Sequence, residues 1–420
     1  MNKPRLLWRS RFFYTKRNNP HNSKGNEAAM NNFIFENATK TYFGKGCVKE
    51  YLTCLSKHYG KNVMLAYGEG SMQENGIYEE IMKSLTKAGK NVVEFSDITS
   101  NPTYAKVLEG AKLARENQIE FILAAGGESV MDCCKAVSMA TVYEGDLWKD
   151  FFARPGIMEF EPIPLGVITT AGAGSEMNGG MVITNEALKI KTGRDYPKCN
   201  PEFALIDPAY TFDESLKKTA TSGFDTLSRI MEMYFCKPDE NNVSDDLAEA
   251  LMRSVIQNLR AVMQTPLDYT ARSNLMWAAT MAENRIIKLG KQADYQCREM
   301  KNQLDAYTGC NHSEGLAVIH PVYFRHIYQD GLAKFQRFAV NVWEIPAEGK
   351  SVKELARAGI EALENFAHEI GMPASLREMD IRESIDLRAV ADSCRLLPGS
   401  YKKMTHSEIL EILQECYETE

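Results

Sequence analysis

Short apolar runs alternate with longer amphipathic stretches through the first half of the chain. The strand-type runs, rich in Val, Ile, Leu, Phe and Ala, are 62–67, 91–95, 121–125, 162–172 and 203–208. Helix-type stretches lie between the earlier runs, at 75–89, 101–117 and 130–141. Strands that are apolar throughout and separated by helices are typical of a parallel sheet covered on both faces. The pattern therefore predicts β-α-β units.

After Asp207 the strand signal fades and apolar residues recur at helical spacing. The clearest amphipathic stretches are 245–264, 271–289 and 352–371, and the segments 265–270 and 345–351 carry the Pro and Gly typical of loops. We therefore expect an α/β Rossmann-like dinucleotide-binding domain at 30–210 and an all-α domain at 211–420. A cleft between two such domains is the default place for a ligand.

Residues 1–29 differ from the rest of the chain. They hold seven Lys or Arg and one acid, without clear periodicity. A basic, acid-poor N-terminus is compatible with a targeting arm. The interpretation we prefer is a disordered extension, or a start codon placed upstream of a natural start at Met30. We exclude this segment from the fold prediction.

Composition narrows the class of protein. The chain is 44% hydrophobic and 25% charged, with a formal net charge of −7, which argues against a nucleic-acid or membrane-surface partner. No apolar run reaches the roughly 18 residues that a membrane span requires. Ten Cys are scattered without a Cys-x-x-Cys pair. This spacing predicts reduced thiols in a cytoplasm, and Cys133 and Cys134 are expected in the core.

Three glycine-bearing turns follow predicted strands, at 67–71, 124–132 and 169–180. Glycine lets backbone amides approach a phosphate closely, and the positive end of a following helix favours an anion. One such turn is a weak signal, because many strand-to-helix turns use glycine only for tight geometry. Three of them in one α/β domain favour a nucleotide site.

These turns, together with segments 31–46 and 272–286, resemble the iron-containing alcohol dehydrogenases. The branch that fits best is the NAD(P)H-dependent butanol dehydrogenases and aldehyde reductases. The resemblance runs from about Met30 into the final third of the chain. It implies the fold shared with dehydroquinate synthase, with NAD(P) in the cleft beside a helical metal-binding domain. It also implies a small alcohol or carbonyl substrate and a homodimer.

The resemblance carries the family's cofactor contacts onto this chain. Lys191 matches a lysine that contacts the nicotinamide ribose, and Glu128 and Ala173 depart from the family's glycine and threonine. The matching cofactor positions are Gly68, Glu69, Gly70, Ser71, Gly126, Gly127, Ser129, Asp132, Thr169 and Lys191. Glu69 resembles the acid of NAD users, while the glycines and serine around it resemble those of NADPH users. The choice between NAD and NADP stays open.

Glu128 raises a physical problem for cofactor binding. At about 5 Å and an effective dielectric near 20, a carboxylate and a bound pyrophosphate repel by roughly 3 kcal/mol. Such a repulsion would weaken binding by about two orders of magnitude. The alternative is that Glu128 turns into solvent and has little effect.

The family's metal site is altered here. Its ligands are an Asp, a His four residues later and two further His, and these positions hold Asp225, Arg229, Arg298 and His312. A relay His four residues after the third ligand becomes Asn302. Arginine has no lone pair for a metal, and two permanent cations repel a divalent ion. We therefore predict that no metal is bound.

Two roles remain for Arg229 and Arg298. They fill the vacated space as ion pairs with Asp225, or they bind a substrate carboxylate, phosphate or oxyanion in place of the metal. The resemblance makes an NAD(P)H-linked alcohol or aldehyde oxidoreductase the first hypothesis. One alternative is a catalytically degenerate partner subunit, and another is a metal-free reductase of an oxo-acid that uses Arg229, Arg298 and Asn302.

Overall fold

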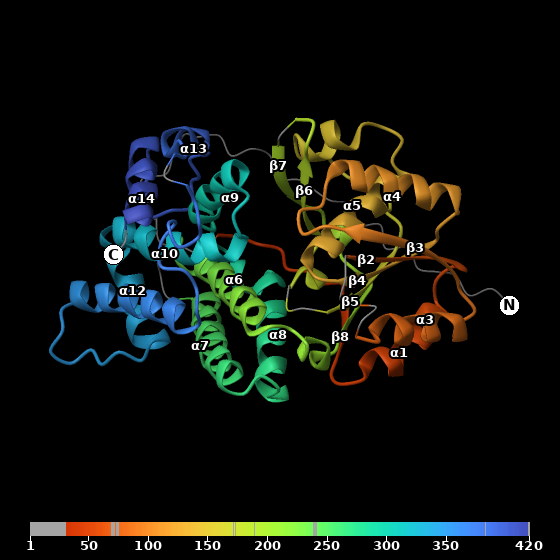
Figure 1. Ribbon diagram of the computed structural model, residues 1–420, viewed down its shortest axis with the longest axis horizontal. Helices are drawn as coiled ribbons and strands as arrows, with labels where there is room; N and C mark the ends of the chain where they lie inside the picture. The colour runs from red at the N-terminus through yellow and green to blue at the C-terminus, as the bar shows by residue number, and fades with distance from the viewer. Residues whose placement is uncertain are drawn as a thin grey trace.

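The computed structural model describes residues 31–418, except 69–71, 73–74, 171, 173, 189, 238–241 and 383. The basic segment 1–29 lies outside the described residues. Within the described part, no helix is long and apolar enough to cross a membrane. Figure 1 shows an α/β half that carries the sheet and a helical half beside it.

The α/β half is built on a six-stranded sheet in the order β1-β8-β5-β4-β2-β3, and each neighbouring pair is parallel. The strands are β1 Lys40–Phe43, β2 Asn62–Gly68, β3 Asn91–Ile98, β4 Phe121–Gly126, β5 Leu165–Thr169 and β8 Phe203–Ile206. The predicted parallel sheet is confirmed. Strand β1 was missed, because four residues carry little periodic signal.

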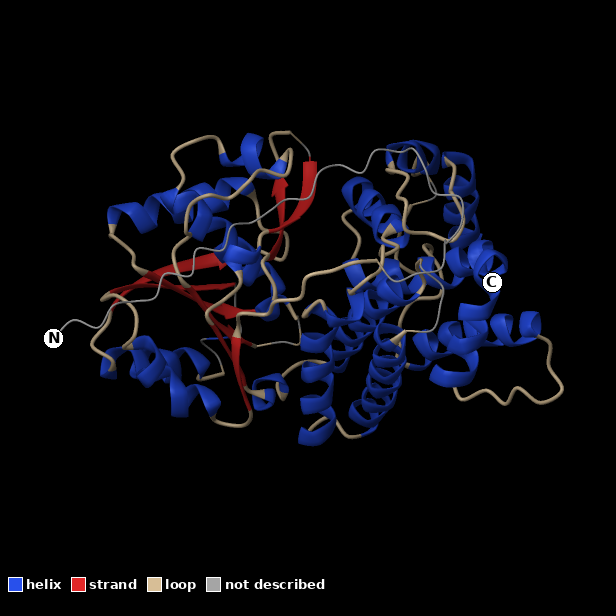
Figure 2. Ribbon diagram, turned by 180° about the vertical axis from the view of Figure 1, so that it is seen from behind, coloured by secondary structure: helices blue, strands red, loops and turns tan. Residues whose placement is uncertain are grey.

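Helices cover both faces of this sheet, as the apolar strands require. Val63 and Leu65 of β2 pack on one face with α1 Cys47–Ser56 and α3 Ile77–Lys87. Met64 and Ala66 point to the other face, which packs on α4 Tyr104–Glu116 and α5 Glu128–Val142. Figure 2 shows the two helical layers on either side of the strands. Cys133 and Cys134 are fully buried in α5, as expected.

A separate antiparallel hairpin, β6 Gly180–Asn185 with β7 Ile190–Asp195, was not predicted. Its two short strands lie in a glycine-containing stretch whose sequence is typical of a loop. The hairpin lies at the side of the sheet that faces α9 Gln296–Thr308 of the helical half (Figure 1). It therefore forms one wall of the space between the two halves.

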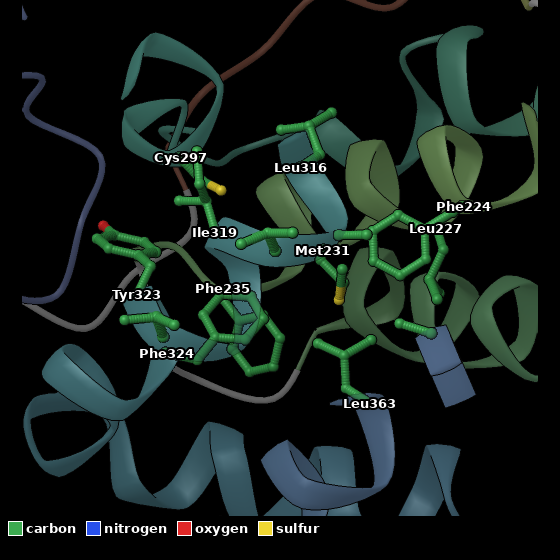
Figure 3. Packing of buried hydrophobic residues seen from close by; sticks show 14 of the residues in the cluster. Phe224, Leu227, Met231, Phe235, Cys297, Leu316, Ile319, Tyr323, Phe324 and Leu363 are labelled. Atoms are coloured by element: carbon green, nitrogen blue, oxygen red, sulfur yellow. The ribbon is translucent and has the colours of Figure 1, made fainter. Parts of the chain in front are cut away.

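The helical half packs around a single apolar cluster, part of which is drawn in Figure 3. Phe224, Leu227 and Met231 recur on one face of α6 at helical spacing and are fully buried there. The other helices are α7 Val243–Gln264, α8 Tyr269–Glu283, α10 His312–Ile327, α11 Leu332–Arg337, α12 Val352–Glu369, α13 Leu387–Ser393 and α14 His406–Glu418, with α6 at Leu216–Tyr234. The predicted α/β plus all-α fold is confirmed.

The predicted helix 271–289 was too long. Helix α8 ends at Glu283, and Arg285 adopts a left-handed backbone with φ of 74°. The side chain of Asn284 accepts a hydrogen bond from the amide of Ile286 at 3.0 Å and so competes with the helical pattern. Buried Ile287 extends the apolar period beyond the end of the helix, which explains the error.

We expect Asp245→Asn to lower the free energy of unfolding by about 3–5 kcal/mol. Asp245 is fully buried in the first turn of α7 and pairs with the ammonium groups of Lys291 and Lys334. Asp246→Asn is the matched control, because Asp246 pairs with Arg337 at the surface and should contribute less than about 1 kcal/mol. Urea unfolding of both variants tests this, and equal losses would contradict the role of burial.

Candidate cofactor and substrate cleft

A cavity of about 720 Å³ lies between the hairpin β6–β7, the start of α5 and the helices α6, α8 and α9. Both halves of the molecule contribute to its walls. Six of the residues singled out from the sequence line it: Glu128, Asp132, Lys191, Arg229, Arg298 and Asn302. The fold thus brings predicted cofactor positions and predicted catalytic positions to one space.

The turn between β4 and α5 has the shape of an anion cradle. A side chain at Gly126 would lie 2.7 Å from Val130, whereas the same position at Gly127 meets open space. Gly127 is the N-cap of α5 and supplies no side-chain cap. The first amides of α5, including that of Ser129, are therefore suited to an anionic ligand. This turn fits the pyrophosphate of a dinucleotide.

The remaining cofactor positions fall at the ends of neighbouring strands. Gly68 ends β2 and Thr169 ends β5, on either side of β4. Carboxyl ends of adjacent parallel strands form the usual ligand edge of an open sheet. Glu69, Gly70 and Ser71, like Ala173, lie outside the described residues, so their predicted contacts stay predictions.

Asp132 and Lys135 hold the loop after β5 in place. The buried Lys135 Nζ donates to Ser175 O and Oγ at 2.7 Å and to Gly180 O at 2.8 Å. Asp132 accepts from Ser175 Oγ and from the amide of Val182, each at 2.9 Å. Burial raises the pKa of Asp132 to about 7, and burial also lowers the pKa of Lys135. Asp132 and Lys135 therefore hold in place the segments at Ser175 and Val182 that line the cavity.

Arg229 is the most heavily paired group in the cleft. Its Nη2 donates to both carboxylate oxygens of Glu128, at 2.9 and 2.6 Å. Its Nε donates to Asp225 Oδ2 at 2.9 Å, and its Nη1 donates to Glu283. Burial lowers the pKa of Arg229, but the carboxylates, Asp225 foremost, outweigh it, so that the pKa lies well above the ordinary value. One guanidinium thus joins α5, α6 and α8.

Arg298, on α9, occupies the other side of Asp225. Its Nε donates to the two carboxylate oxygens of Glu232 at 3.0 and 3.1 Å, and its Nη2 lies 3.8 Å from Asp225 Oδ1. Burial raises the pKa of Glu232 to about 7, although Arg298 opposes this shift. Asp225 therefore lies between two guanidiniums.

This donor set does not fit a divalent metal. Arg229 and Arg298 stand at two of the positions that the family resemblance assigns to metal ligands, and both engage Asp225. Within the described part of the chain, no group of three or more His, Cys, Asp or Glu could hold a metal ion. His312 begins α10, and its side chain lies outside the part of the structure that is described.

Three further placements complete the set of predicted residues. Glu128 accepts two hydrogen bonds from Arg229, so it does not turn freely into solvent, while its predicted repulsion of a pyrophosphate stays a prediction. Lys191 donates to Asn101 Oδ1 at 2.7 Å and lies 3.5 Å from Asp305 of α9. Asn302 lines the cavity from α9, at the position of the family's relay His.

Several charged residues of the cleft were not predicted from the sequence. Glu232 lies three residues after Arg229 on the same helix, so helical spacing could have indicated it. Glu283 gave no such signal, and neither did the pair formed by Arg285 and Asp195. That pair joins the segment after α8 to the hairpin, and only the tertiary fold brings its members together.

Comparison with known proteins agrees with this architecture. Residues 38–208 match the family model for iron-containing alcohol dehydrogenase. Residues 219–417 match the model for the C-terminal part of the same family. The chain therefore belongs to the iron-containing alcohol dehydrogenase family and is an oxidoreductase of that class.

Individual relatives cover nearly the whole chain. A probable NADH-dependent butanol dehydrogenase of Bacillus subtilis is 34% identical over 388 residues, which are 92% of this chain and 99% of the relative. The NADPH-dependent aldehyde reductase YqhD of Escherichia coli is 31% identical over 351 residues, 83% of this chain and 89% of the relative. The crystal structure of NADH-dependent butanol dehydrogenase A from Thermotoga maritima superimposes with a TM-score of 0.85 at 32% identity, covering 93% of this chain and 99% of that one.

We expect Lys135→Met to lower the free energy of unfolding by about 3–5 kcal/mol, since it strands the buried acceptors of the loop after β5. The matched control is Lys112→Met, whose exposed partner Glu116 should contribute less than about 1 kcal/mol. Urea unfolding of both variants measures the difference. A loss for Lys135→Met no larger than the control's would contradict the supporting role of Lys135.

Proposed function

We propose that this protein reduces a small aldehyde with NADH or NADPH in the cleft, and oxidises the corresponding alcohol in reverse, without a bound divalent metal. The observation that carries the proposal is the 720 Å³ cavity between the first turns of α5, the hairpin β6–β7 and the helical half. The names of the relatives, butanol dehydrogenases and an aldehyde reductase, support the substrate class.

When bound, the cofactor supplies or accepts the hydride. The chain's own groups would position it: the amides at the start of α5 would hold the phosphates, and Lys191 of the hairpin would contact the ribose. An amide such as that of Asn302, which lines the cavity, can donate a hydrogen bond to the carbonyl oxygen but releases no proton. The cavity walls orient the reactants and limit the access of water.

Pairing argues against the oxo-acid alternative. That hypothesis needs a guanidinium open to a substrate anion, yet Arg229 is surrounded by three carboxylates and Arg298 binds Glu232. Adding a further anion to these groups means replacing existing ion pairs. We therefore favour an uncharged carbonyl substrate.

A homodimer in the cytoplasm forms part of the same proposal. All ten cysteines are free thiols, which suits a reducing compartment. Phe33, Ile34 and Phe35 are exposed near the start of the described chain, and exposed Phe43 contacts exposed Trp277. Apolar surface of this kind favours a partner subunit.

The first test is oxidation of NADH and NADPH by the purified protein, in EDTA, over a panel of straight-chain aldehydes and 2-oxo-acids. We expect turnover with aldehydes that EDTA leaves unchanged. Preference for oxo-acids would favour the arginine-dependent alternative. The absence of turnover with either cofactor would favour a degenerate partner subunit.

Measurement of the metal content tests the proposal that the protein works without a bound divalent metal. We expect substoichiometric iron and zinc in protein purified without added metal. The double variant Arg229→His with Arg298→His restores the family's ligand types, and we expect it to gain metal measured by mass spectrometry. Asp225→Asn in that background is the matched control and should lower the gain. Stoichiometric metal in the unmodified protein would contradict the proposal.

A further inference from the structure

Two departures from the family pattern meet in space. Glu128 replaces a glycine of the phosphate turn, and Arg229 replaces a histidine of the metal site. They are 101 residues apart in sequence, yet the Arg229 Nη2 lies 2.9 and 2.6 Å from the two carboxylate oxygens of Glu128. Without Arg229, Glu128 would lose the cation that it pairs with, whereas Arg229 without Glu128 would keep Asp225 and Glu283.

We propose that Arg229 is a positioning residue for the dinucleotide: by pairing with Glu128, it makes the start of α5 acceptable to the pyrophosphate. This inference rests on the proposed function. It concerns the affinity for the cofactor and does not require Arg229 to touch the reacting atoms.

The geometry explains how the pairing acts. Glu128 is the first residue of α5 and follows the open position at Gly127, where the phosphate cradle lies. The double hydrogen bond joins its carboxylate to Arg229 of α6. It also supplies the opposite charge at contact distance, which offsets most of the repulsion between the carboxylate and a phosphate.

Arg229 is itself held firmly. Asp225 of its own helix and Glu283 at the end of α8 fix the other two edges of the guanidinium. Only 12% of the Arg229 side chain is exposed, against 36% for Glu128. The anchored arginine therefore determines where the more exposed carboxylate lies.

The test is a double-mutant cycle on the dissociation constants of NADH and NADPH, measured by quenching of tryptophan fluorescence. We expect Arg229→Gln to weaken binding about 100-fold, the effect of an unpaired carboxylate beside the pyrophosphate. Glu128→Gln alone should bind as tightly as the unmodified protein or more tightly. The double variant should return to within about threefold of the unmodified protein.

Arg285→Gln is the matched control, because Arg285 also lines the cavity and also forms an ion pair across the cleft, with Asp195. We expect its effect on cofactor binding to be the same with or without Glu128→Gln. Circular dichroism and thermal melting establish that each variant is folded. If Arg229→Gln does not fold, Arg229→Lys replaces it, with about tenfold weaker binding that Glu128→Gln relieves.

The outcomes separate the two proposals. Additive effects of Arg229→Gln and Glu128→Gln would overturn the positioning role. Equal rescue of Arg285→Gln and Arg229→Gln by Glu128→Gln would also overturn it, since the effect would then be a general one of charge. If the unmodified protein binds neither nucleotide, the proposed function fails, and the positioning role fails with it.

Discussion

The guanidinium of Arg229 is the interaction on which the cleft depends. A guanidinium has no lone pair for a metal. That of Arg229 donates hydrogen bonds to carboxylates from three elements: Glu128 of α5, Asp225 of α6 and Glu283 of α8. Removing one member of a buried ion pair leaves its partner uncompensated, which destabilises a protein far more than the pair stabilises it. Asp225 and Glu283 are mostly buried and therefore depend on Arg229, together with Arg298 and Asn178, for compensation of their charge.

The two arginines also preserve the charge of the site. In the metal site that the family resemblance implies, a divalent ion would place two positive charges beside Asp225. Here Arg229 and Arg298 place two permanent positive charges around the same aspartate. Glu128, Glu232 and Glu283 all direct oxygens at these guanidiniums. The charge is retained, but none of it is left open for a substrate oxygen.

The strands at 62–67, 91–95 and 121–125 could be predicted because burial on both faces leaves a continuous apolar run. Hairpin β6–β7 could not, because β7 holds one apolar residue, Ile190, and no buried position, and each of its strands contains a glycine. The same limit applies to the site. Glycine turns and ligand spacing are local and identified Gly126, Arg229 and Arg298, whereas the partners of these arginines come from distant elements.

The pairing across the cleft has a consequence for access to the cavity. Three ion pairs join the α/β half to the helical half around it: Glu128 with Arg229, Asp195 with Arg285, and Lys191 with Asp305. Glu128 and Arg229 both line the cavity, as do Asp195 and Arg285, and Lys191 lines it as well. Separation of the two halves must break all three pairs. The ion pairs that join the halves therefore surround the space in which the proposed cofactor would bind.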